Sequence, residues 1–192
     1  MASIDQALKI SENLFVDGEF IANLRSLVSF VTDSKNSVSN ENLIRYYVDG
    51  LSGILAELGL QTEIIDNPIK NAPPFLIGKR IESSELKTIL LYGHGDTVPL
   101  QQELWNEGIS PSKLKIIDEK IYGRGVADNK GQHLVNLMAL LSVLKTRKKL
   151  GFNIKVIFEM GEEVGSPGLF ELCEQYKDYL KSDVLIASDG PR

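Results

Sequence analysis

The sequence has few of the residues that build disulfide scaffolds or nucleic-acid surfaces. Cys173 is the one cysteine in 192 residues, so an internal disulfide is excluded and a reducing, cytoplasmic location is expected. Only two histidines occur, so a histidine-rich metal site would need other donors. The net charge of −5 gives no electrostatic reason to expect a nucleic-acid partner.

Long apolar runs are also missing. No stretch approaches the ~20 apolar residues of a membrane span, and the first residues lack the basic region and apolar core of a signal peptide. We therefore expect no membrane partner. What remains is an ordinary globular composition, 43% hydrophobic and 24% charged, in a length that suits one domain with a substantial core.

Apolar periodicity divides the chain into helices that alternate with strands. Two helices are predicted over residues 4–31, with an interruption near Asp17 and Gly18, and a long amphipathic helix is predicted to end at Gly59. Further strands are predicted at residues 60–65, 75–81, 88–92, 114–122 (two short strands), 152–160 and 184–187, with the last expected to be buried. Helices are predicted after residue 131, apolar nearly all round and therefore buried, and over residues 167–180. This alternation predicts an α/β fold with a doubly wound, mostly parallel central sheet between helical layers.

The predicted strand at residues 88–92 leads directly to His94, with Asp96 two residues further on. His94 can give one ring nitrogen to a metal while Asp96 accepts the proton on the other nitrogen. Such a pair also recurs by chance, and a lone histidine is more often structural than ligating.

Two later strands end in the same way. Glu162 and Glu163 follow the strand at residues 152–160, Asp189 follows the strand at residues 184–187, and Asp128 opens the predicted buried helix. Parallel neighbours would bring these side chains together at the carboxyl edge of the sheet. Each acid alone is most simply a surface carboxylate or a helix cap. Their recurrence at strand ends instead favours a site for Zn²⁺ or a similar divalent ion.

A glycine-rich stretch at residues 123–131 invites a dinucleotide-binding interpretation. Gly123 and Gly125 would need a third glycine at position 128, where Asp128 would repel a pyrophosphate. A nucleotide-binding module is therefore disfavoured.

Four motifs carry a resemblance to a known family. They are YGHGDTVP at residues 92–99, GRGVADNKG at 123–131, GEEVGSPG at 161–168 and SDG at 188–190. In order and spacing they resemble the di-zinc peptidases and deacylases, a family that includes aminoacylase, carnosine dipeptidase, glutamate carboxypeptidase, acetylornithine deacetylase and succinyl-diaminopimelate desuccinylase. The Asp-Asn-Lys-Gly form of the second motif resembles the dipeptidase branch more than the deacylases.

The resemblance implies a three-layer αβα catalytic domain and metal-dependent hydrolysis of a dipeptide or N-acyl amino acid through a water held between two zinc ions, with cobalt or manganese as alternative metals. By position, it implies these roles: His94 and Asp189 bind the first metal, Glu163 binds the second, Asp128 bridges both, Glu162 is the general base and Asp96 orients His94.

Length is the one departure from the family pattern. Members are about twice as long, with a lid domain, the rest of the catalytic domain and a last histidine ligand after the stretch seen here. Residues 1–192 are therefore expected to be the N-terminal portion of the catalytic domain, and any homodimer would form through the lid. The alternative is a truncated remnant that binds metal or a partner without catalysis, and we expect the chain alone to be inactive. His133 could replace the missing ligand, but its place in the buried helix favours a structural role.

Overall fold

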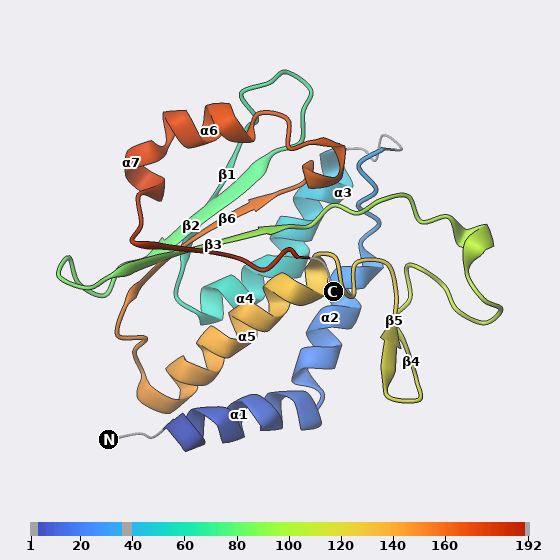
Figure 1. Cartoon of the computed structure of the whole chain (residues 1–192), viewed down its shortest axis with the longest axis horizontal. Coiled ribbons are helices and arrows are strands. Elements are labelled where there is room, and N and C mark those ends of the chain that lie inside the picture. Colours follow the sequence, from blue (N-terminus) through green and yellow to red (C-terminus); the bar gives the residue numbers. More distant parts are fainter. Residues whose placement is uncertain (1–3, 36–39, 191–192) are drawn as a thin grey trace.

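A five-stranded mixed sheet lies at the centre of the computed structural model, which describes residues 4–35 and 40–190 (Figure 1). Its strand order is β1-β2-β6-β3-β7. The strands are β1 (Gln61–Ile65), β2 (Phe75–Arg80), β3 (Thr88–His94), β6 (Asn153–Glu159) and β7 (Val184–Ala187). β3 pairs in parallel with β6 and β7, whereas β2 pairs antiparallel with β1 and β6. All strands except β2 therefore run in one direction, and the prediction of a mostly parallel sheet is confirmed.

Helices cover both faces of this sheet, which makes the fold three-layered. One face carries α3 (Asn40–Arg45), the π-helical turn η1 (Tyr46–Leu51), α4 (Ser52–Glu57) and α5 (Lys130–Arg147), and the other carries α6 (Leu169–Gln175) and α7 (Lys177–Leu180). The helices α1 (Ile4–Val16) and α2 (Glu19–Ser29) pack against α5, and α1 lies beyond it, away from the strands (Figure 1). Alternate side chains of a strand point to opposite faces. On β6, Ile154, Val156 and Phe158 accordingly join the larger core, and Ile157 joins the smaller core under α6 and α7.

Local sequence signals account for most of the element boundaries. Gly18, in the left-handed conformation at φ +83°, separates α1 from α2, as the sequence predicts. The long helix predicted before Gly59 is present, with η1 between α3 and α4. The predicted helix over residues 167–180 is divided at Tyr176 into α6 and α7.

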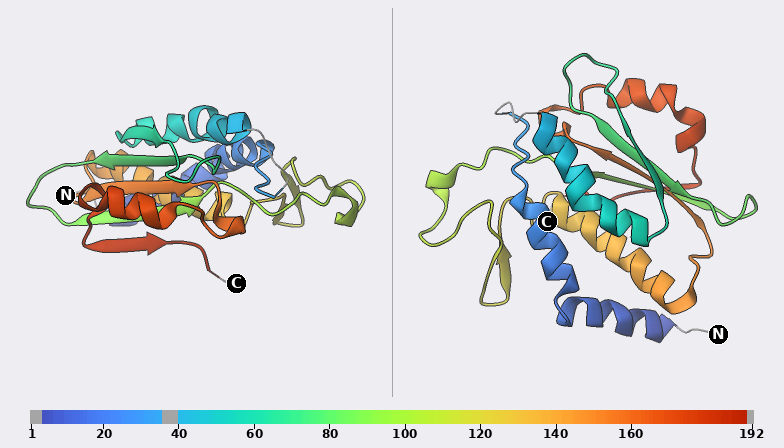
Figure 2. Two further views of the ribbon diagram at one scale, coloured as in Figure 1. Left: turned by 90° about the horizontal axis from the view of Figure 1, so that it is seen from above. Right: turned by 180° about the vertical axis from the view of Figure 1, so that it is seen from behind.

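One prediction of burial is wrong, for β7, and another, for α5, is confirmed for most of the helix but not for all of it. β7 is exposed along its whole length, with Leu185 61% exposed, because it is the edge strand and the described residues do not cover it (Figure 2). In α5, Val135 is 53% exposed, although the other face of that helix is buried. Leu185 and Val135 are apolar, so the sequence indicated that they would be buried, but burial depends on what packs against them.

The segment between β3 and α5 extends away from the sheet (Figure 2). It contains the 3₁₀ turn η2 (Gln102–Leu104) and a hairpin of β4 (Lys115–Ile117) and β5 (Lys120–Tyr122). Asp118 and Glu119 form the hairpin turn with positive φ angles, which matches the two short strands predicted there. Among residues 4–35 and 40–190, no helix is long and apolar enough to cross a membrane.

Candidate metal centre

The register of three parallel strands brings their carboxyl ends to one edge of the sheet. His94 is the last residue of β3 and lies opposite Glu159, the last residue of β6. On the other side of β3, Tyr92 lies opposite Ala187, so Asp189 follows β7 at the level of His94. The central strand thus supplies the imidazole, and its two neighbours lead directly into acidic segments.

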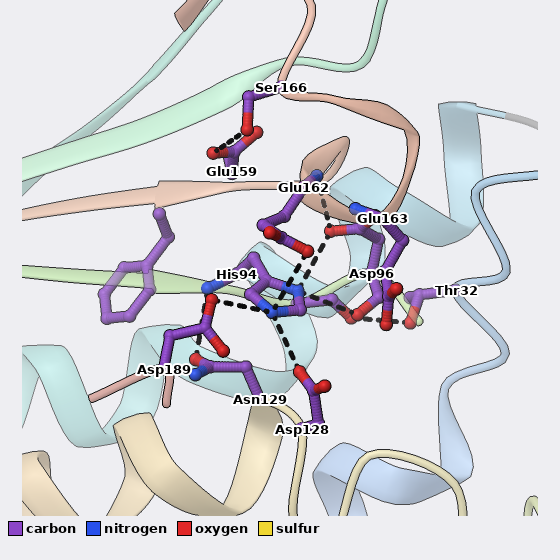
Figure 3. A network of polar contacts seen from close by, with 12 residues as sticks. Thr32, His94, Asp96, Asp128, Asn129, Glu159, Glu162, Glu163, Ser166 and Asp189 are labelled. Atoms are coloured by element: carbon purple, nitrogen blue, oxygen red, sulfur yellow. Dashed lines mark hydrogen bonds and ion pairs between the residues drawn. The ribbon is translucent and has the colours of Figure 1, made fainter. Parts of the chain in front are cut away.

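Carboxylates surround the Nε2 atom of His94 (Figure 3). It lies 3.1 Å from Oδ1 of Asp128, 3.7 Å from Oδ2 of Asp189 and 3.8 Å from Oε2 of Glu162. His94, Glu162 and Asp189 each offer a ligand atom within 4.8 Å of the others. His94 itself is completely buried, whereas the side chain of Asp128 is 63% exposed. The cluster therefore joins a rigid buried donor to carboxylates that reach solvent.

Asp96 holds the opposite side of the imidazole. Its Oδ1 lies 3.2 Å from Nδ1 of His94, and both residues are fully buried. The same carboxylate accepts hydrogen bonds from the backbone N–H groups of Glu162 (3.2 Å) and Glu163 (3.1 Å), which begin the 3₁₀ turn η3 (Glu162–Val164). Asp96 therefore orients His94 and also ties the loop that carries both glutamates to the end of β3.

The two adjacent glutamates point differently. Glu162 approaches His94, whereas Oε1 of Glu163 accepts a hydrogen bond of 3.2 Å from the backbone N–H of Val98. Of the six residues predicted for the site, the structure gathers His94, Asp128, Glu162 and Asp189 around one point, places Asp96 behind the ring, and places Glu163 beside the loop at Val98.

The electrostatics of this edge reflect an excess of carboxylates. Burial opposes the charged form of His94, but its hydrogen bond to Asp96 and the negative charges of Asp96, Asp189 and Glu162 raise its pKa to about 9. Burial first, and then the charges of Asp189 and Asp96, raise the pKa of Glu162, with His94 acting in the opposite direction. Carboxylates crowded in this way favour a cation between them.

The donor set fits a divalent metal ion. One imidazole nitrogen, fixed by a carboxylate on the other nitrogen, faces oxygen donors from three separate segments. This mixture of nitrogen and carboxylate oxygen is the ligand type of catalytic zinc sites and of related transition-metal sites. Within the described residues, His94, Glu162 and Asp189 are the one group of three such side chains whose donor atoms lie this close together.

Glycines flank His94 because the surrounding side chains leave no room for a Cβ atom. A Cβ on Gly93 would lie 2.8 Å from Cβ of His133, and one on Gly95 would lie 2.5 Å from Cε1 of Tyr46. The Gly-His-Gly sequence therefore allows β3 to end tightly against α5 and η1.

Several contacts of the site have no signal in the sequence pattern. The hydroxyl of Thr32 donates a hydrogen bond of 2.6 Å to the carbonyl of Gly95. The hydroxyl of Tyr46 forms a hydrogen bond of 2.7 Å with Nε2 of His133. His133 is buried, and its two ring nitrogens contact Tyr46 and Asn129 instead of the acidic cluster, which agrees with the structural role predicted for it. Thr32 and Tyr46 lie far from the motifs in sequence, so sequence reasoning did not find them.

The fold and the site together define a class: an α/β protein with a candidate divalent-metal centre at the carboxyl edge of its sheet. Comparison with known proteins narrows this class. The model of peptidase family M20/M25/M40 matches residues 90–191, and the chain belongs to this family.

Relatives of this chain include proteins that are named as dipeptidases. It is 32% identical to mouse Beta-Ala-His dipeptidase over 185 residues, which is 90% of this chain and 37% of that protein. It is 34% identical over 138 residues to the cysteinylglycine-S-conjugate dipeptidase of Corynebacterium striatum, covering 71% of this chain and 29% of that protein. Among solved structures, human carnosine dipeptidase 1 superposes with a TM-score of 0.83 at 29% identity, over 97% of this chain and 41% of that chain. The chain thus spans less than half the length of these relatives.

Proposed function

We propose that the protein carrying this chain is a metal-dependent hydrolase that cleaves the amide bond of a dipeptide or an N-acyl amino acid. The observation that supports this most directly is the cluster of carboxylates around Nε2 of His94, with Nδ1 held by Asp96. Family membership and the dipeptidase relatives favour a small peptide as substrate. Zinc is the metal that we propose first, because one imidazole with several carboxylates suits it.

We assign His94, Asp128 and Asp189 as ligands of one metal, with Asp128 shared and Glu163 as a ligand of the second. When bound, the metal ions would lower the pKa of a water molecule and polarise the scissile carbonyl. Asp96 keeps Nε2 of His94 directed at the site, because its backbone carbonyl and its carboxylate both lie beside Nδ1, at 3.1 Å and 3.2 Å.

Glu162 is the proposed general base. Its side chain is 36% exposed and its Oε2 lies 3.8 Å from Nε2 of His94, so it can contact both solvent and a bound substrate. The carboxylate would accept a proton from the attacking water and return it to the leaving nitrogen. Asp96 sets its position, because it holds the backbone N–H of Glu162.

We further propose that residues 1–192 are the N-terminal part of the catalytic domain, since 90% of the chain aligns with only 37% of the mouse relative. A cytoplasmic location is proposed from the single free cysteine, Cys173.

The test is a metal titration of the full-length protein by chelator competition, together with assays on dipeptides and N-acyl amino acids. Turnover should disappear with chelator and return with Zn²⁺. The 192-residue chain alone should bind one zinc more tightly than a second, because three proposed ligands meet near Nε2 of His94 whereas Glu163 lies against Val98. A full-length protein that binds no divalent ion, or that hydrolyses neither substrate class, would contradict the proposal.

A further inference from the structure

Asn129 lies fully buried behind the candidate metal centre and uses all four of its hydrogen-bonding positions. Its Oδ1 lies 3.2 Å from the backbone nitrogen of His94 and 3.1 Å from Nδ1 of His133. Its Nδ2 donates to the carbonyl of Ser188 at 2.6 Å and to Oε1 of Gln132 at 2.9 Å. The side chain is therefore held in one orientation.

These contacts determine where the protons lie. The backbone N–H of His94 can only donate, so the atom facing it is the amide oxygen of Asn129, and Nδ1 of His133 must also carry a proton. In a neutral imidazole Nε2 is then an acceptor, and it receives the hydroxyl proton of Tyr46 at 2.7 Å. Burial, and then the charges of His94 and Lys130, lower the pKa of His133 to about 3, which agrees with a neutral ring.

This chain of hydrogen bonds joins the segments that carry the proposed ligands. Asn129 follows Asp128, contacts the backbone of His94 at the end of β3, and holds the carbonyl of Ser188, the residue before Asp189 (Figure 3). Asn129 packs closely against the end of β3, as the space at Gly93 shows: a Cβ there would lie 3.2 Å from Oδ1 of Asn129. A single amide thus joins His94 to Ser188 just beyond Tyr92 and Ala187, the last residues that pair between β3 and β7.

We propose that Asn129, supported from behind by His133 and Tyr46, is a positioning residue that sets His94 and Asp189 at the separation that the metal centre needs. The proposal rests on the proposed function, because it assumes that those two side chains bind metal. Asn129 contacts the backbone on either side and acts through the two ligands.

The test uses Co²⁺ as the probe in the full-length protein, since its visible absorption reports coordination geometry. Asn129→Ala should lower Co²⁺ affinity by about 10- to 100-fold, the usual effect of losing a residue that orients ligands, and should change the absorption bands. Melting temperatures of the metal-free variants measure any general loss of stability.

Asn153 provides a matched control. It is also buried, and it binds four backbone groups: its Oδ1 accepts from Glu82 (2.8 Å) and Ser83 (3.2 Å), and its Nδ2 donates to Ser83 (2.8 Å) and Leu86 (3.0 Å). It begins β6, whereas the metal centre lies at the other end of that strand. Asn153→Ala should therefore destabilise the fold to a similar degree and leave Co²⁺ affinity and spectrum unchanged.

Unchanged affinity and spectrum in Asn129→Ala, or an equal loss of affinity in Asn153→Ala, would overturn the inference and leave the proposed function standing. A wild-type protein that binds no Co²⁺ would overturn both. If Asn129→Ala does not fold, His133→Phe serves instead, because it keeps Asn129 and removes one of the two donors to its oxygen. That variant should show a smaller loss of affinity with altered bands, and wild-type values would again overturn the inference.

Discussion

Replacing Asp96 with asparagine tests the local architecture most directly. The change keeps the shape of the side chain but removes its charge and turns one acceptor into a donor. In the native site, Oδ1 faces Nδ1 of His94 and the N–H of Glu162, while Oδ2 accepts from the N–H of Glu163. An amide cannot accept all three hydrogen bonds, so at least one buried N–H group would face another donor.

The magnitude follows from these contacts. A hydrogen bond to a charged group contributes about 1.5–3 kcal/mol, and an unsatisfied buried group costs about 1–3 kcal/mol. Loss of one negative charge also relieves repulsion between Asp96 and the carboxylates of Glu162 and Glu163, which offsets part of the cost. We therefore expect the metal-free variant to lose about 1–3 kcal/mol, or roughly 2–12 °C in melting temperature. Metal affinity should fall by about 10- to 100-fold, because the imidazole of His94 and the glutamate loop both lose the charged carboxylate that orients them, and only the backbone carbonyl of residue 96 still accepts from Nδ1 of His94.

Asp183→Asn is the control for this change. Asp183 accepts from the backbone N–H of Thr88 at 2.9 Å and pairs with Lys87 at 2.7 Å, at the opposite end of β3 from His94. This variant should bind metal as the wild type does. Chelator-competition titration and thermal denaturation of both variants provide the measurement. Wild-type metal affinity in Asp96→Asn would refute the argument that its carboxylate orients the site.

Three further predictions concern single positions. Glu162→Gln should keep its metal but lose turnover by about 10²-fold or more, and loss of metal instead would show that Glu162 is a ligand and that the roles of the two glutamates are exchanged. Gly95→Ala should destabilise the protein by about 1–3 kcal/mol in denaturant titrations, because its Cβ would lie 2.5 Å from Tyr46. Gly53→Ala is the control: a Cβ there meets open space on α4, so this variant should be as stable as the wild type or slightly more stable. Equal effects of the two substitutions would contradict the packing argument. The pKa of His133 is about 3 in the folded protein and 6.5 in the unfolded chain, so on acidification the unfolded chain binds the proton at a higher pH. The free energy of unfolding should therefore fall as the pH drops from 6.5 toward 3, by up to about 1.4 kcal/mol per pH unit. Urea titrations from pH 7 to 4.5 should show a smaller loss in His133→Phe than in the wild type, and identical pH profiles would count against a buried neutral ring.

Local signals in the sequence were enough to predict most elements of the fold. The break at Gly18, the strands that became β2, β3 and β6, and the hairpin turn at Asp118 depend on neighbouring residues and on apolar spacing. Burial was predicted less well. The strand β7 has the composition of a buried strand but lies exposed at the sheet edge, because burial depends on what packs against a strand.

For the candidate site, the sequence determined which strand ends carry His94, the glutamate pair and Asp189, since parallel strands deliver their carboxyl ends to one edge. Only the tertiary structure decided which glutamate approaches His94, because adjacent residues in an irregular turn can point in any direction. It also decided that Asn129 would join the end of β3 to the segment after β7 and accept a hydrogen bond from His133 of α5. Such contacts depend on the crossing of segments far apart in the chain, and no spacing along the sequence encodes how closely they approach.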